Sequence, residues 1–110
     1  MKNILEVTDE TDSCYPNCRI VHIRPAPFSI TSGGSFPGDA ITDSMLFYIS
    51  MVEDCPRYKC LIESKNFTDC VLDVYTANPA EGTKVVCHPN WKDRRSNQVF
   101  ILDKRPKHTC

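Results

Sequence analysis

Cysteine is the residue type in this sequence with the most obvious chemistry. The 110-residue chain contains seven cysteines. Thiols can pair as disulfides, and two closely spaced pairs of thiolates can bind zinc. The spacings Cys14-x3-Cys18 and Cys55-x4-Cys60 are wider than the tight zinc type, and three cysteines would remain outside such a site. We therefore expect disulfides and no metal or other cofactor, and the predicted bonded cysteines are Cys14, Cys18, Cys55, Cys60, Cys70 and Cys87.

An odd number of cysteines leaves at least one without a partner in its own chain. Cys110 ends the chain after a basic tail and is the best candidate for a free or intermolecular cysteine. In that role it would produce a disulfide-linked homodimer. The alternative is that Cys110 secures the tail and another cysteine stays free.

The cysteine content predicts a secreted or extracellular protein, because cytosolic thiols are kept reduced. Asn66-Phe67-Thr68 is an acceptor sequence for N-glycosylation, which agrees with a secretory route. Acidic residues soon after Leu5 end any signal-like apolar region, so we expect a mature chain. The longest apolar run, residues 45–52, is too short to span a membrane.

Histidine could support acid–base catalysis, and His22, His88 and His108 with neighbouring basic residues invite comparison with secreted ribonucleases. Two of these histidines lie on expected strands and the third lies in a terminal tail. The chain also has no Gly-x-Ser-x-Gly elbow, and the glycine-rich loop at 32–38 lacks the Lys-Ser/Thr ending of a phosphate-binding loop. We therefore expect no catalysis, with a small secreted hydrolase as the alternative.

The C-terminal quarter carries more basic than acidic residues, although the net charge of the chain is −1. Trp and Arg are enriched in the residues that dominate binding energy at protein interfaces. We expect binding of another protein, either acidic or glycosylated, and the slightly acidic balance argues against nucleic acid. The predicted binding residues are Trp91, Lys92, Arg94 and Arg95.

Short runs of β-branched and aromatic residues, broken by Pro and Gly, predict a mainly β fold with little helix. Residues 1–13 form an acidic arm that is either disordered or an edge strand, and residues 14–110 form one disulfide-rich domain. Expected strands cover 18–24, 45–52, 57–62, 70–76, 83–88 and 98–103, with a short one at 28–31.

The clearest element is a β-hairpin over 70–88, whose strands flank a turn containing Asn78-Pro79 and Gly82. Symmetric pairing about the turn places Leu72 opposite Cys87 and Val74 opposite Val85, with Cys70 on the same face. Cys70 and Cys87 could then form a diagonal disulfide. The opposite face, with Asp73, Tyr75, Lys84, Val86 and His88, is expected to meet water.

The core is expected to come from this hairpin and from a buried strand at 45–52. The architecture is then a small disulfide-stabilised antiparallel sheet or sandwich. The predicted core residues are Leu46, Phe47, Ile49, Leu72, Val74, Val85, Phe100 and Leu102.

The cysteine order resembles that of the six-cysteine C6 domains of nematode extracellular proteins. The resemblance rests on Cys14-Tyr15-Pro16-Asn17-Cys18, on Cys55 with Cys60, and on the segment 85–91 that contains Cys87. It covers little beyond the cysteines, and an extra cysteine, Cys70 or Cys110, departs from the pattern. The resemblance implies an ectodomain or secreted module that binds a partner. The residues favour the same function: a ligand, receptor module or effector, with a structural module cross-linked through the odd cysteine as another alternative.

Overall fold

The computed structural model describes residues 3–25, 41–54, 57–93 and 95–101. These residues form a single antiparallel sheet of seven strands and three short 3-10 turns, which confirms the predicted mainly β class. The elements are β1 (Asn3–Thr11), β2 (Arg19–Pro25), η2 (Asp43–Met45), β3 (Phe47–Glu53), β4 (Lys59–Ser64), β5 (Cys70–Val74), η3 (Tyr75–Ala77), β6 (Val85–Pro89), η4 (Ser96–Gln98) and β7 (Phe100–Ile101).

Several expectations of the sequence fall on residues outside the described part of the chain. These are the short strand at 28–31, the glycine-rich loop at 32–38, and the residues Cys55, Arg94, Leu102, His108 and Cys110.

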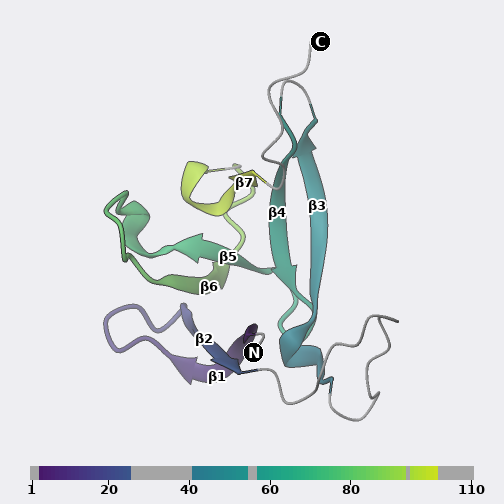
Figure 1. Ribbon diagram of the computed structural model, residues 1–110. Helices are drawn as coiled ribbons and strands as arrows, with labels where there is room; N and C mark the ends of the chain where they lie inside the picture. Colours follow the sequence, from purple (N-terminus) through teal and green to yellow (C-terminus); the bar gives the residue numbers. More distant parts are fainter. Residues whose placement is uncertain (1–2, 26–40, 55–56, 94, 102–110) are drawn as a thin grey trace.

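The sheet has the order β1-β2-β6-β5-β4-β3, and β7 pairs with β4. Figure 1 shows β1, β2, β6 and β5 running across one part of the molecule, while the β3–β4 hairpin projects at a steep angle to them. The two parts are joined in the sheet through one register pair, Glu63 with Val71. β1 and β3 are the first and last strands in this order, so each has a free edge in the described sheet.

The β5–β6 hairpin has the register that its turn predicts. Leu72 lies opposite Cys87 and Val74 lies opposite Val85, as expected. Side chains alternate between faces along a strand, so a turn of fixed length decides which residues pair. Gly82 occupies the turn at a φ of 86°, in the left-handed region that favours glycine.

The other expected strands are present with shifted ends. β4 begins at Lys59 and extends to Ser64, past the expected end, and within the described residues β7 covers Phe100–Ile101. The N-terminal arm was expected to be either disordered or an edge strand. The structure has the edge strand, β1, which pairs with β2 along most of its length.

The buried core is small and half of its apolar members are cysteines. Val7, Cys70 and Cys87 form a buried cluster at the junction of β1, β5 and β6, with Phe47 and Phe67 packed against it. A core with so few aliphatic side chains supplies limited hydrophobic stabilisation. The buried apolar residues are Val7, Cys18, Cys60, Cys70, Val71, Leu72, Val86 and Cys87.

The expectation of a buried strand at 45–52 is wrong. Ile49 is 55% exposed and Leu46 is 36% exposed, whereas Leu72 is buried as predicted. The apolar sequence correctly indicated a strand, but burial depends on what covers the strand. β3 lies at the end of the sheet, and its hairpin with β4 projects away from the core (Figure 1).

The expectation that the second face of the β5–β6 hairpin meets water is also wrong in part. Asp73 is 4% exposed and Val86 is 2% exposed, although both lie on that face. The segment that contains η4 folds back over this face, and the side chain of Gln98 donates a hydrogen bond to Asp73 Oδ2 over 2.8 Å. The segment that contains η4 therefore covers part of a hairpin face that would otherwise be exposed to solvent.

A pair of substitutions tests where the core lies. We expect Val86→Ala to lower the free energy of unfolding by about 2 kcal/mol, because it removes fully buried methyl groups and leaves a cavity. Ile49→Ala should change the free energy of unfolding by less than about 0.5 kcal/mol, as exposed positions usually do. Urea denaturation of dilute protein measures both. An Ile49→Ala effect as large as that of Val86→Ala would contradict this placement of the core.

Candidate functional site

An open cleft of about 420 Å³ lies against the β5–β6 hairpin, between the loop after β1 and the segment that leads to η4. Its floor contains Cys18, Asp73 and Val86, which are buried. The walls are rich in aromatic rings and contain one guanidinium group. We call this feature the aromatic cleft, and its wall residues are Tyr15, Tyr75, Thr76, Ala77, His88, Trp91, Arg95 and Asn97.

The carboxylate of Asp73 fixes one wall of the aromatic cleft. Its two oxygens accept hydrogen bonds from the side-chain amides of Asn97, at 2.9 Å, and Gln98, at 2.8 Å. Gln98 is fully buried and also donates to the carbonyl of Pro89, while its side-chain oxygen accepts a bond from the backbone N–H of Trp91 at 3.2 Å. Buried polar groups with all partners satisfied hold a single geometry. Gln98 therefore ties the loop of Trp91 to the sheet.

Trp91 is stacked by two neighbours from its own segment. The His88 ring lies nearly parallel to it, with centroids 5.2 Å apart, and the Arg95 guanidinium carbon lies 3.9 Å from the Trp91 ring centroid. Such cation–π contacts contribute about 0.5–1 kcal/mol at exposed sites. Trp91 is nevertheless 47% exposed, so much of the indole faces solvent in a fixed orientation.

Asp12 fixes the opposite wall. Its carboxylate accepts hydrogen bonds from the Tyr75 hydroxyl at 2.7 Å and from the Lys84 ammonium at 2.9 Å. The backbone N–H groups of Cys14 and Tyr15 donate to the same carboxylate at 3.0 Å. These bonds favour the charged form and lower the pKa of Asp12 to about 2, with the Tyr75 hydroxyl as the largest cause. The same bond raises the pKa of Tyr75.

Tyr15 and Tyr75 form an edge-to-face pair beside this carboxylate, with ring centroids 5.6 Å apart. Tyr15 is 51% exposed. Next to Tyr75, Thr76 and Ala77 have φ angles of 54° and 55°, in the left-handed region that non-glycine residues rarely adopt. Backbone strain of this kind is concentrated at binding and catalytic sites, and here it lies in the cleft wall.

The structure pairs the predicted basic binding residues that it describes with acidic ones. Lys92 forms an ion pair with Asp69, and Arg95 Nε lies 2.8 Å from Asp93 Oδ2. Trp91 and Arg95 meet in the aromatic cleft, whereas Lys92 does not line it. The net positive field expected for this surface is therefore reduced, and its aromatic rings become the main feature.

The two described histidines, His22 and His88, do not converge on one site. His88 stacks on Trp91, and its Nδ1 lies 2.8 Å from the carbonyl oxygen of Pro89. The β2–β6 register pairs Ile20 with Val86, so His22 lies four positions away from His88 along the sheet, about 13 Å. His22 lies 4.0 Å from Glu10 instead. Within the described residues, no group of three or more His, Cys, Asp or Glu has the arrangement of a metal site.

The five described cysteines are not disulfide-bonded in the structure, but two of them touch. The side chains of Cys70 and Cys87 lie together in the buried cluster, and their interaction raises the pKa of Cys87 and lowers that of Cys70. Cys18 is buried, whereas Cys14 is exposed. Burial raises the pKa of Cys18 and of Cys60.

Asn66, the predicted glycosylation site, is exposed in the turn between β4 and β5. Its position leaves the side chain accessible to a modifying enzyme. No described helix is long and apolar enough to cross a membrane.

Sequence reasoning missed most of the cleft. The sequence places Tyr15 in the Cys14–Cys18 motif and Tyr75 on a strand face expected to meet water, and Asp12 and Gln98 are not among the predicted site residues. Their grouping depends on contacts between residues up to 72 positions apart, such as Lys84 with Asp12. The local signals were a turn-forming Asp two residues before Cys14 and a cluster of aromatics next to cysteines.

Comparison with known proteins found no matching family model, no similar curated protein and no similar solved structure. The resemblance to C6 domains stays a prediction.

The Asp12 interactions predict a specific pH dependence. Because the folded-state pKa of Asp12 is about 2, below its ordinary value of 3.8, its contribution is present above about pH 4 and is lost as the pH falls through about 2. We expect Asp12→Asn to destabilise the protein at pH 7, and the difference from wild type to shrink towards pH 2. Urea denaturation at pH 7, 4 and 2 measures this.

Asp9→Asn is the matched control, because Asp9 is exposed. It should leave the pH profile close to that of the wild type. An unchanged difference between wild type and Asp12→Asn from pH 7 to pH 2 would show that the Asp12 charge is not the source of the stabilisation.

Proposed function

We propose that this protein is a secreted or extracellular recognition module that binds another protein through the aromatic cleft, without catalysis. The observation that carries the proposal is the combination of exposure and fixed geometry in the cleft walls. Trp91 and Tyr15 are about half exposed, yet each is anchored to a buried carboxylate system, through Gln98 and through Asp12 respectively.

Exposed but rigid aromatic residues are efficient binding groups. They bury a large area on contact and lose little conformational entropy, because the surrounding structure already orders them. Trp, Tyr and Arg are the residue types most enriched among energetically dominant interface positions, and Trp91, Tyr15 and Arg95 supply all three.

The ion pairs of this surface indicate which kind of partner it can bind. Lys92, Arg95 and Lys84 each have a carboxylate partner, so general attraction for an acidic molecule is weak. Specificity would come from an apolar or aromatic side chain of the partner that enters the cleft, together with hydrogen bonds to its polar rim. This favours a protein segment over a sulfated glycan or a nucleic acid.

The binding proposal can be tested with a displayed random-peptide library selected on the immobilised wild-type protein. We expect selected peptides to bind Trp91→Ala at least about 30-fold more weakly, which corresponds to the roughly 2 kcal/mol of a dominant interface residue. Tyr48→Ala is the matched control, because Tyr48 is 55% exposed on β3, away from the cleft.

Peptides that bind Tyr48→Ala as tightly as the wild type and lose binding to Trp91→Ala would support the cleft as the binding site. Selection of peptides that are insensitive to Trp91→Ala, or no selection at all, would reject it.

The secreted assignment is supported by the position of Cys70 and Cys87, which lie in one buried cluster at diagonal positions of the β5–β6 hairpin. In an oxidising compartment these two thiols would lose two protons and two electrons to a disulfide oxidant and form one S–S bond. A disulfide that closes a loop of this length stabilises by about 3 kcal/mol in the chain-entropy model. The small core makes such a constraint valuable.

Peptide mapping of secreted, unreduced protein should yield Cys70 linked to Cys87. Reduction should lower the free energy of unfolding by roughly the 3 kcal/mol of the loop model. Recovery of both residues as alkylated thiols, or of either one linked to a different cysteine such as Cys18, would contradict the pairing.

A further inference from the structure

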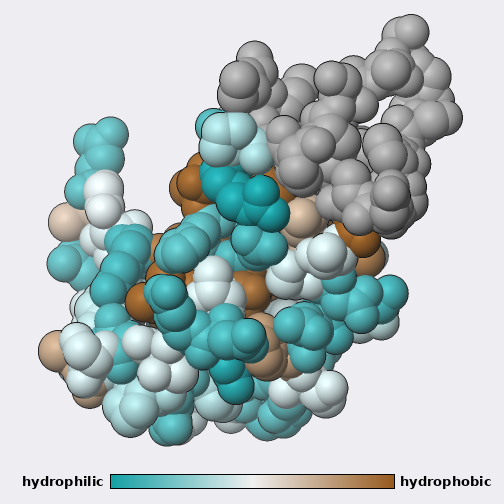
Figure 2. Space-filling view, turned by 90° about the horizontal axis from the view of Figure 1, so that it is seen from below, coloured by the Kyte–Doolittle hydropathy of each residue, from teal (hydrophilic) through white to brown (hydrophobic). Residues whose placement is uncertain are grey.

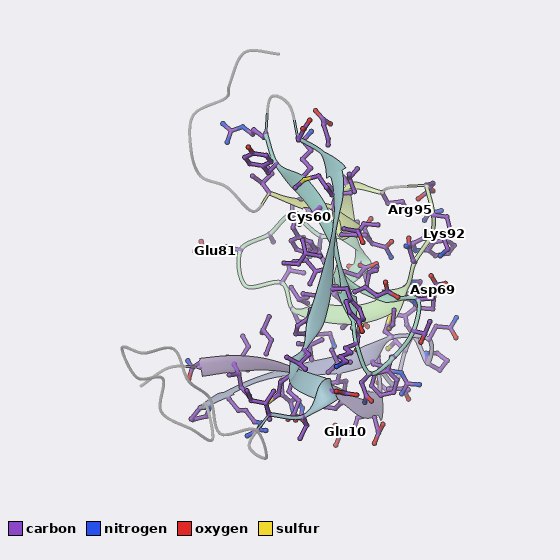
Figure 3. All side chains as sticks on the ribbon, turned by 90° about the vertical axis from the view of Figure 1, so that its right-hand side faces the viewer. Glu10, Cys60, Asp69, Glu81, Lys92 and Arg95 are labelled. Carbon is purple, nitrogen blue, oxygen red and sulfur yellow. The ribbon has the colours of Figure 1, made fainter. Side chains whose placement is uncertain are left out.

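β3 presents an open edge that no described residue covers. It ends the strand order, and β4 is its only strand neighbour in the described part of the chain. Figure 3 looks onto this edge and shows β3 running along the front of the molecule, with Lys92 and Arg95 to its side. Three of its side chains are more than half exposed: Tyr48 at 55%, Ile49 at 55% and Met51 at 53%.

The pairing with β4 decides which backbone groups face outward. The backbone N–H of Lys65 donates to the carbonyl of Leu46, which marks that position as a hydrogen-bonded pair. Hydrogen-bonded and non-hydrogen-bonded pairs alternate in an antiparallel ladder. Tyr48 and Ser50 therefore bond to β4, while the N–H and C=O groups of Phe47, Ile49 and Met51 point to the open edge.

The edge also lacks the features that normally prevent strand pairing. Sheet edges are usually protected by charged side chains, by proline or by a very short strand. β1, the opposite end of the sheet, carries Glu6, Asp9 and Glu10. β3 has no charge and no proline between Phe47 and Val52, and its register shift falls only at its end, after Met51. β3 is thus suited to accept another strand.

We propose that β3 pairs antiparallel with β3 of a second copy of this chain, about a two-fold axis at Ile49. In that register Ile49 faces Ile49 of the second copy, and Phe47 faces its Met51 on each side of the axis. All outward backbone groups of the two strands are used, which gives up to about six new hydrogen bonds.

The side chains and charges of β3 select a second copy as the occupant. A two-fold interface needs a surface that is complementary to itself, and this register sets apolar side chains against apolar ones on one face. Tyr48 and Ser50 face each other on the other face. The strand ends carry ion pairs within the chain, Lys59 with Glu53 at 3.6 Å and Lys65 with Asp43 at 3.5 Å. In this register Glu53 of one copy comes near Asp43 of the other, and the lysine partner of each carboxylate reduces the repulsion between the copies.

The dimer formed in this way is weak and reversible. A contact one strand wide lies at the small end of specific interfaces, below about 1,200 Å². We expect a monomer–dimer equilibrium at micromolar concentrations. It is distinct from a covalent dimer through Cys110, because it persists under reduction.

Sedimentation velocity over a concentration series, with reducing agent present, tests the proposal on the full chain. We expect the wild type to shift from monomer to dimer, and Ile49→Lys to stay monomeric at concentrations at least tenfold higher. The added ammonium groups would face each other across the axis. Ile23→Lys is the matched control, because Ile23 is 71% exposed on β2, and it should dimerise like the wild type.

Dimerisation unaffected by Ile49→Lys would overturn the proposal, as would a wild type that stays monomeric across the series. A monomer whose Ile49 amide is protected from hydrogen exchange would show that a segment of the same chain occupies the edge, which also overturns it. Circular dichroism confirms that each variant is folded. If Ile49→Lys does not fold, the wild-type series still decides whether a non-covalent dimer exists, and Met51→Lys locates it.

Discussion

The hydrogen bonds of the buried Gln98 side chain determine how the last part of the chain lies on the sheet. Gln98 is the largest fully buried side chain among the described residues, and it contacts Asp73 on β5, the carbonyl of Pro89 and the backbone of Trp91. A buried amide without these partners would cost about 1–3 kcal/mol per unsatisfied group, so this segment has one strongly preferred position. The burial of Asp73 and the position of one cleft wall follow from it.

The second wall depends on a similar arrangement around Asp12. Here the carboxylate is charged, and it gathers a tyrosine hydroxyl, an ammonium group and two backbone N–H groups from segments far apart in the sequence. Both walls of the aromatic cleft are thus positioned by polar interactions. This is consistent with a core too small to position surface segments by apolar packing.

In this small core, cysteines are buried while several large apolar side chains remain exposed on β3. Cys18, Cys60, Cys70 and Cys87 occupy core positions that aliphatic residues fill in larger domains, while Tyr48, Ile49 and Met51 stay at the surface of β3. Apolar side chains that stay exposed on an open strand form a surface that can bind another molecule. The aromatic cleft contains no residue of β3, so the two candidate binding surfaces are formed by different residues. In the view of Figure 2, hydrophilic side chains cover most of the described face and apolar atoms lie between them.

Local sequence patterns were sufficient to predict the class of fold and the best-defined hairpin. Alternating apolar residues and a turn of fixed length are local properties, so Leu72 opposite Cys87 and Val74 opposite Val85 could be derived before any tertiary contact was known. The sequence also drew attention to Trp91 and Arg95. Three further features depend on tertiary contacts: the apolar run of β3 lies at an open edge, η4 covers Asp73, and Lys92 and Lys84 pair with Asp69 and Asp12. No local pattern in the sequence predicts these features, because burial and ion pairing depend on which distant segments become neighbours in the fold.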